Sequence, residues 1–138
     1  MLYVFDASFI GALIIPDEGG RQIYKMYDKL KNEDEKHAPH LIWYEITSIF
    51  NKLILHRRFS KNEVLAFYPL LGAFRLICDS AEGSDYSEKL LDLCGSLGLS
   101  SYDAAYLELA KRKNAVLCTL DVALRAAAKK HGVAVMKT

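Results

Sequence analysis

The stretch from residue 99 to residue 128 constrains the fold most, because it alternates helix, strand and helix within a short span. Residues 115–118, Ala-Val-Leu-Cys, form an unbroken apolar run that is typical of a strand buried on both faces. Helical sequence ends before it near Asn114, and a second helix opens after it at Asp121. In a parallel sheet, ligands bind at the crevice just past the strand carboxyl ends. The stretch therefore predicts that Asp103 and Asp121 lie on one rim.

The same alternation extends along the whole chain and predicts an α/β fold in a single domain over residues 1–138. A capping-box pattern, Ser60 with Glu63, marks one helix start, and Pro69 and Gly72 predict a break in that helix. We expect a mostly parallel sheet with right-handed crossovers and helices on both faces. Five strands are predicted, at residues 2–5, 37–39, 76–78, 115–118 and 133–135.

Composition excludes several classes of protein. A hydrophobic content of 51% with 25% charged residues is typical of a compact soluble domain and excludes a disordered chain. The net charge of +1 argues against binding to nucleic acid through overall charge alone. The uncharged runs are too short to cross a membrane, and the N-terminus has no signal-peptide pattern. Three cysteines without CxxC spacing favour reduced thiols in a cytoplasmic protein.

Four acidic residues occupy positions that the predicted sheet would bring together. Asp6 and Asp121 directly follow strands and so share one sheet edge. Asp103 lies in the first turn of a helix, behind two serines that can cap it. Glu45 lies near the start of another helix, beside the apolar stripe that faces the sheet. Capping is the ordinary role of an aspartate at a helix start, and this interpretation stays open for each aspartate.

Carboxylates that meet in one place repel one another and raise each other's pKa unless a cation neutralises them. Hard divalent cations such as Mg²⁺ and Mn²⁺ prefer all-oxygen ligands of this kind. A hydroxyl residue also lies near each aspartate, for example Ser8 and Thr119. The joint pattern favours a divalent metal site over independent helix caps.

The motifs around these acids resemble those of PIN-domain ribonucleases. They are VFDAS with Asp6, YEITSIF with Glu45, SSYDAAYLELA with Asp103 and CTLDVAL with Asp121. The resemblance covers residues 2–135, and the length is similar to that of VapC-type toxins from toxin–antitoxin pairs. Many relatives carry an asparagine three residues after the glutamate, where this chain has Ser48. The expected fold is therefore a single PIN-like domain.

This resemblance implies a metal-dependent endoribonuclease that uses Mg²⁺ or Mn²⁺ to activate a water against RNA phosphodiester bonds. Asp6, Asp103 and Asp121 would hold the metal, directly or through water. Glu45 would either bind the metal or orient the attacking water. All four acids are thus candidate catalytic residues.

Neighbouring side chains have supporting roles in this interpretation. Ser8 and Thr119 would orient the carboxylates through hydrogen bonds. Arg125, one turn beyond the last acid, is a candidate phosphate contact. Tyr102 and Tyr106 are interpreted as packing residues and not as base-stacking ones. The histidines are scattered along the sequence, and none is expected to bind a metal.

The toxin resemblance implies RNA as substrate, a small antitoxin protein as partner and a homodimer. The short uncharged runs predict no membrane association. Three alternatives stay open. One is a PIN nuclease that processes RNA without an antitoxin. Another is a non-catalytic binding scaffold, which the presence of all four acids disfavours. The third is a phospho-acceptor signalling domain, which needs an adjacent acidic pair after the first strand, and Phe5-Asp6-Ala7 has none.

Overall fold

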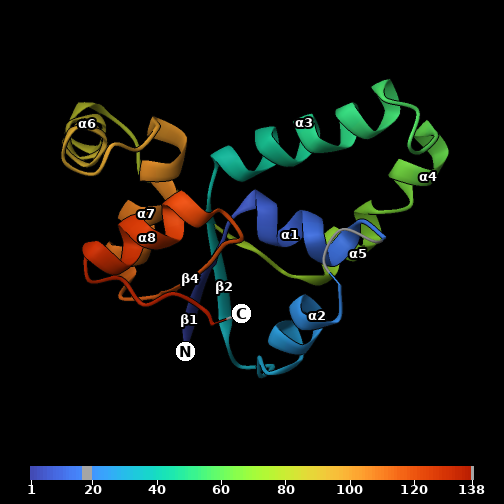
Figure 1. Cartoon of the computed structure of the whole chain (residues 1–138), viewed down its shortest axis with the longest axis horizontal. Coiled ribbons are helices and arrows are strands. Elements are labelled where there is room, and N and C mark those ends of the chain that lie inside the picture. Colours follow the sequence, from blue (N-terminus) through green and yellow to red (C-terminus); the bar gives the residue numbers. More distant parts are fainter. Residues whose placement is uncertain (17–19, 138) are drawn as a thin grey trace.

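A four-stranded parallel sheet forms the centre of the protein (Figure 1). The computed structural model describes residues 1–16 and 20–137. The strand order is β3-β2-β1-β4, and the register aligns Val4 with His37 on one side and with Leu117 on the other. The predicted mostly parallel α/β fold is confirmed. The strands are β1 (Leu2–Phe5), β2 (Glu35–Pro39), β3 (Ile77–Asp79) and β4 (Val116–Cys118).

The prediction of a fifth strand at residues 133–135 is wrong. In the part of the chain that the structure describes, this run makes a single parallel bridge, from Val135 to Leu117. Leu117 donates a backbone hydrogen bond to Ala134, and Met136 donates one back to Leu117, at 2.8 and 2.9 Å. These two bonds surround one residue of β4, so the short run touches the sheet edge without continuing as a ladder.

Helices cover both faces of the sheet, as predicted. Figure 1 shows α7 and α8 on one side and α1, α2 and α5 on the other, with α3 across the top and α6 outside α7. α7 packs directly on β1, β2 and β4. The bounds are α1 (Ala7–Ile14), α2 (Gly20–Asp28), α3 (Leu41–Leu55), α4 (Lys61–Leu65), α5 (Tyr68–Ala73), α6 (Ser84–Leu97), α7 (Ser101–Lys113) and α8 (Val122–Lys130). In the described ranges, none of these helices has the length and apolar character to cross a membrane.

Local sequence explains where several helices begin and end. Ser60 and Glu63 form both hydrogen bonds of a capping box at the start of α4. The predicted break falls just before Pro69, which occupies the first turn of α5, where its missing N–H costs nothing. Gly98 and Asn114 adopt left-handed backbone conformations, with φ of 67° and 52°, and end α6 and α7.

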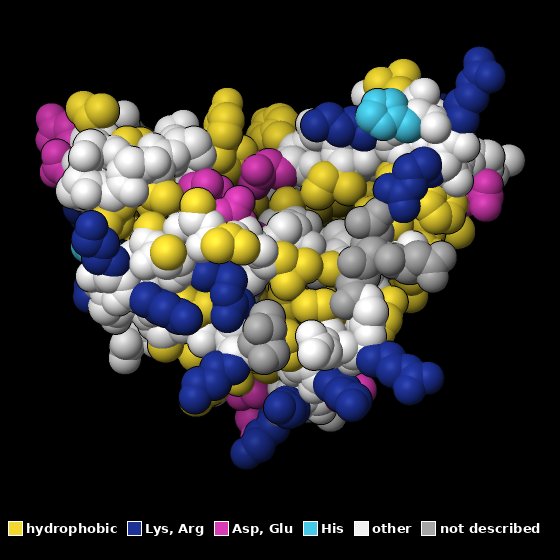
Figure 2. Space-filling model, in the orientation of Figure 1, with side chains coloured by type: hydrophobic (Ala, Val, Ile, Leu, Met, Phe, Trp, Pro, Cys, Tyr) yellow, Lys and Arg dark blue, Asp and Glu magenta, His cyan; other side chains and the backbone are white. Residues whose placement is uncertain are grey.

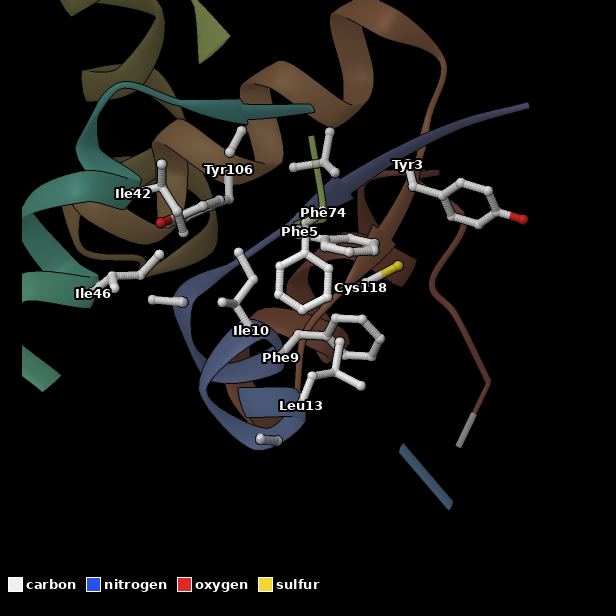
Figure 3. Close-up of a cluster of buried hydrophobic side chains, with 14 of the residues drawn as sticks. Tyr3, Phe5, Phe9, Ile10, Leu13, Ile42, Ile46, Phe74, Tyr106 and Cys118 are labelled. Atoms are coloured by element: carbon white, nitrogen blue, oxygen red, sulfur yellow. The ribbon is translucent and has the colours of Figure 1, made fainter. Parts of the chain in front are cut away.

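The core extends over both faces of the sheet, and Figure 3 shows the part of it between α1, α3 and the sheet. Phe5 of β1 packs edge-to-face against Phe9 of α1, with ring centroids 4.9 Å apart. Ile42 and Ile46 supply the α3 face of this core. α3 is thereby fixed over the carboxyl edge of the sheet, where the candidate acids lie.

A charged clamp joins α7 to the end of β3. Arg112 donates to both carboxylate oxygens of Asp79, at 3.1 and 2.6 Å, and to Glu108 one turn earlier, at 2.7 Å. The Glu108 residue is only 7% exposed, so it needs this partner. The Arg112 hydrogen bonds hold the pKa of Asp79 below its usual value.

Candidate metal-binding and catalytic site

All four predicted acids line one cavity of about 710 Å³ at the carboxyl edge of the sheet. Asp6 follows β1 and Asp121 follows β4, while Glu45 lies in α3 and Asp103 in the first turn of α7. Figure 2 shows acidic side chains gathered in a hollow between α3 and α7, with Lys and Arg over α8 and at the far end of α3. Parallel strands that end at one edge bring together residues that are distant in sequence.

Asp6 both caps α1 and faces the cavity. Its Oδ1 accepts hydrogen bonds from the Phe9 amide at 2.9 Å and the Ser8 hydroxyl at 2.7 Å. Its Oδ2 accepts a hydrogen bond from the Thr119 hydroxyl. Burial raises the pKa of Asp6 to about 6, although these three hydrogen bonds act to lower it. The capping role and the metal-binding role are therefore compatible for this residue.

Two hydroxyl groups tie the β1–α1 junction to the β4–α8 junction. Thr119 is buried, donates to Asp6 and accepts a hydrogen bond from the Asp121 amide at 3.1 Å. Ser8 donates to Asp6 and accepts a hydrogen bond from the Leu120 amide at 3.0 Å. Both hydroxyls thus contact the Asp6 carboxylate, and their role in fixing its orientation stays a prediction.

The other two aspartates differ in their capping roles. Asp121 is the N-cap of α8, and its Oδ1 accepts a hydrogen bond from the Leu124 amide at 2.8 Å. Asp103 is not a cap, because Ser100 caps α7 and accepts a hydrogen bond from the Asp103 amide at 3.2 Å. Burial and the nearby Asp121 charge raise the pKa of Asp103. The Asp103 carboxylate lies in the first turn, where it suits the helix dipole, and it also lines the cavity.

Glu45 receives a hydrogen bond that the sequence did not reveal. The Tyr106 hydroxyl donates to Glu45 Oε1 at 2.5 Å, and Tyr106 reaches from α7 toward α3 with only 1% of its surface exposed (Figure 3). Burial raises the pKa of Glu45, and the Tyr106 hydrogen bond acts in the opposite direction. Tyr106 lies three residues after Asp103, on the same face of the helix. This spacing was the sequence signal that could have placed Tyr106 near the acids.

Tyr102 is not a packing residue, and its interpretation from sequence is wrong. It is 60% exposed and lines the acidic cavity. The reason is its place at the start of α7, two residues before the helix enters the core. The fully buried part of α7 begins only at Ala104.

One face of α3 contributes further lining residues. Tyr44, Ser48 and Lys52 line the cavity together with Glu45, at the spacing of successive helical turns. Lys52 is the one lysine or arginine among the cavity-lining residues that the structure describes. The lining therefore holds four carboxylates and one lysine, so the cavity is acidic.

Arg125 does not line the cavity. Its Nη1 donates to the backbone carbonyls of Thr119 and Met136, at 3.1 and 3.0 Å, and so fastens the C-terminal segment to the β4–α8 junction. A phosphate contact from Arg125 stays a prediction.

The donor set of the cavity fits a hard divalent cation. Within residues 1–16 and 20–137, no three Asp, Glu, His or Cys side chains are close enough to enclose a metal ion. Mg²⁺ does not require such a cage, because it keeps several waters and is commonly held by one or two carboxylates. Bound positive charge would also offset the burial and repulsion that raise the pKa values of Asp6, Glu45 and Asp103.

Comparisons with known proteins agree with this fold. The chain resembles PAE2754 from Pyrobaculum aerophilum with 24% identity and a TM-score of 0.71, over 98% of this chain and 83% of that one. It resembles VapBC2 from Rickettsia felis, solved with promoter DNA, with 16% identity and a TM-score of 0.70, over 98% and 97%. It resembles VapC20 from Mycobacterium tuberculosis, a sarcin-ricin-loop-cleaving toxin, with 16% identity and a TM-score of 0.64, over 92% and 95%.

At these levels of identity the structural likenesses establish a shared fold. No curated protein sequence matches the chain. The PIN-domain model, by contrast, matches residues 3–135, a span that contains all four acids. On this match, the chain belongs to the PIN-domain family.

Proposed function

We propose that the protein is an endoribonuclease that depends on Mg²⁺ or Mn²⁺ and hydrolyses RNA phosphodiester bonds. The observation that carries the proposal is the meeting of Asp6, Glu45, Asp103 and Asp121, from four separate elements, at one cavity. Carboxylates are costly to bring together in a fold, and a structural role alone does not require all four.

The proposed mechanism assigns a task to each acid. Asp6, Asp103 and Asp121 would hold the cation, directly or through water. When bound, the cation would lower the pKa of a coordinated water and offset charge that develops on the phosphate. Glu45 would orient the attacking water. The Tyr106 hydroxyl donates a hydrogen bond to Glu45 Oε1. Glu45 Oε2 would then accept the proton from that water.

We further propose that the protein acts as the toxin of a VapBC-type toxin–antitoxin pair in the cytoplasm. Fold similarity to VapBC2 and VapC20 supports this assignment. A small antitoxin would then be the protein partner, and the toxin would form a homodimer. The test is co-purification of a small protein with the tagged chain from its native host, together with the mass of the complex. Recovery of the chain alone would favour an RNA-processing enzyme without an antitoxin.

Cleavage of a panel of end-labelled RNAs in Mg²⁺, Mn²⁺ or EDTA tests the activity. We expect cleavage in either metal, none in EDTA, and none with Asp103→Asn or Asp6→Asn. Asp85→Asn is the matched control, because Asp85 is also an acid in the first turn of a helix but is exposed and lies outside the cavity. Cleavage that persists in EDTA, or that Asp103→Asn leaves unchanged, would contradict the proposal.

A further inference from the structure

We propose that a second cavity, next to the acidic one, binds an unpaired nucleobase adjacent to the phosphodiester that is cut. This inference rests on the proposed nuclease function. The second cavity, called the side cavity below, has a volume of about 270 Å³ and is lined from β2, β3, α6, α7 and the start of α3. Leu41 and Tyr102 line both cavities, so the two share a wall.

The side cavity has the lining of a small-ligand pocket. Tyr86, Tyr102, Leu90 and other apolar residues form its walls, and Ser101 adds a polar group. Apolar and aromatic walls with a few polar groups are characteristic of such pockets. Proteins that recognise single-stranded RNA stack unpaired bases on aromatic side chains and bind the base edges with polar groups.

Charge favours a neutral ligand in the side cavity. In the described part of the chain, no lysine or arginine lines it. Its one carboxylate, on Asp79, accepts two hydrogen bonds from Arg112 and one from the Ala81 amide, at 3.1, 2.6 and 3.2 Å. A phosphate would find no lysine or arginine among the described lining residues, where His40 is the one basic side chain. A neutral base, by contrast, meets mostly apolar walls and an Asp79 carboxylate that Arg112 already neutralises.

The charge of the acidic cavity explains why RNA binding would need a second, uncharged contact. Four carboxylates and Lys52 line the acidic cavity, so the lining alone repels a phosphodiester strand. Stacking of a base provides affinity that does not depend on charge.

Tyr102 connects the two cavities directly. It precedes Asp103 in the chain and is 60% exposed. A strand whose phosphate lies at Asp103 therefore has a neighbouring base at Tyr102. That base must leave its helical stack to enter the side cavity, which selects for unpaired RNA.

Nucleotide binding can be measured without cleavage. We would titrate the isotope-labelled protein in EDTA with the four nucleoside 5′-monophosphates and with single-stranded tetranucleotides, and follow the resonances of Tyr86, Leu90 and Tyr102 by NMR. We expect shifts at these residues, and about tenfold weaker binding in Leu90→Trp, which fills the side cavity. The matched control is Leu93→Trp on the same helix, which lies in the lining of a different cavity and should bind normally.

A second variant guards against a folding defect in Leu90→Trp. Tyr102→Ala removes the shared wall from an exposed position, and Tyr24→Ala, an exposed tyrosine on α2, is its control. We expect weaker nucleotide binding in Tyr102→Ala only. The inference is overturned if no nucleotide shifts the side-cavity resonances, or if Tyr102→Ala and Tyr24→Ala bind alike. The side cavity would then serve a protein partner or no ligand.

A cleavage assay distinguishes failure of this inference from failure of the proposed function. RNA with one abasic nucleotide beside the cut should be cleaved about tenfold more slowly by the wild type, and Leu90→Trp should not distinguish it from intact RNA. Loss of all cleavage with intact nucleotide binding would refute the nuclease and not the base site. Cleavage that is insensitive to abasic positions would refute the base site and not the nuclease.

Discussion

Asp6→Asn should stabilise the metal-free protein while it abolishes function. Asp6 is 5% exposed and its pKa is raised from 3.8 to about 6. A shift of this size corresponds to a cost of about 3 kcal/mol for carrying the charge at neutral pH. An asparagine can still act as the N-cap of α1. It has lost the charge that interacts with the helix dipole, and its amide places a donor against the Thr119 hydroxyl. Together these two losses cost about 1–2 kcal/mol of stability. The net gain of about 1–2 kcal/mol predicts a Tm higher by about 3–8 °C.

The pH dependence of this gain is fixed by the sign of the pKa shift. Because the folded-state pKa of Asp6 is raised, the folded wild type holds its proton more tightly than the unfolded chain does. The contribution of that proton to stability is fully present below about pH 4 and is lost as the pH rises through about 6. The Tm difference between Asp6→Asn and wild type should therefore be smallest near pH 4, grow up to pH 6 and level off above it.

Thermal unfolding in EDTA between pH 4 and 8 measures this difference, with the exposed Asp85→Asn as control. An Asp6→Asn protein less stable than wild type at pH 7.5, or a difference that does not change with pH, would refute the reasoning. Added Mg²⁺ should raise the Tm of the wild type in proportion to the logarithm of its concentration and leave Asp6→Asn nearly unchanged. An equal rise in both proteins would show that Asp6 does not hold the ion.

Two further changes test the surroundings of the site. Tyr106→Phe removes the hydrogen-bond donor to Glu45, so kcat should fall about tenfold. The affinity for RNA, measured in EDTA, should be unchanged. Equal kcat values for the variant and the wild type would show that the hydrogen bond is only structural. Arg112→Met leaves the buried Glu108 without its partner and should lower the free energy of unfolding in urea by about 2–4 kcal/mol at pH 7. Since the pKa of Asp79 is lowered, the Arg112→Met deficit should shrink as the pH falls through that pKa, and a deficit that is constant with pH would contradict this assignment.

The sequence predicted the sheet edge well because short-range signals determine it. Ser100 and Asp121 cap helices where their residue types indicated, and the strand–Asp–helix pattern brought Asp6 to the same edge. The prediction failed where long-range geometry decides the outcome. Whether residues 133–135 form a strand depends on how far they run along β4, and neither apolar content nor β propensity encodes that distance.

The direction in which side chains point was the second feature that the sequence did not predict. Tyr102 and Tyr106 have the same type and lie on the same helix, yet one is exposed and the other is buried against Glu45. Their environments depend on where α7 enters the core and on how α3 crosses above it. Apolar periodicity places α7 on the sheet but does not reveal which of its polar atoms meets α3.

The four acids are spread over the sequence from Asp6 to Asp121, and the hydroxyl of Thr119 joins the first and last of these regions. A nascent chain that has emerged only as far as α6 lacks both Asp103 and Asp121 and cannot assemble the site. An incompletely synthesised chain therefore lacks the complete set of acids. A single proteolytic cut that releases β4 and α8 would separate Asp121 from Asp6 and so end the proposed activity in one step. The site of the proposed nuclease is therefore assembled only once β4 and the start of α8 are in place.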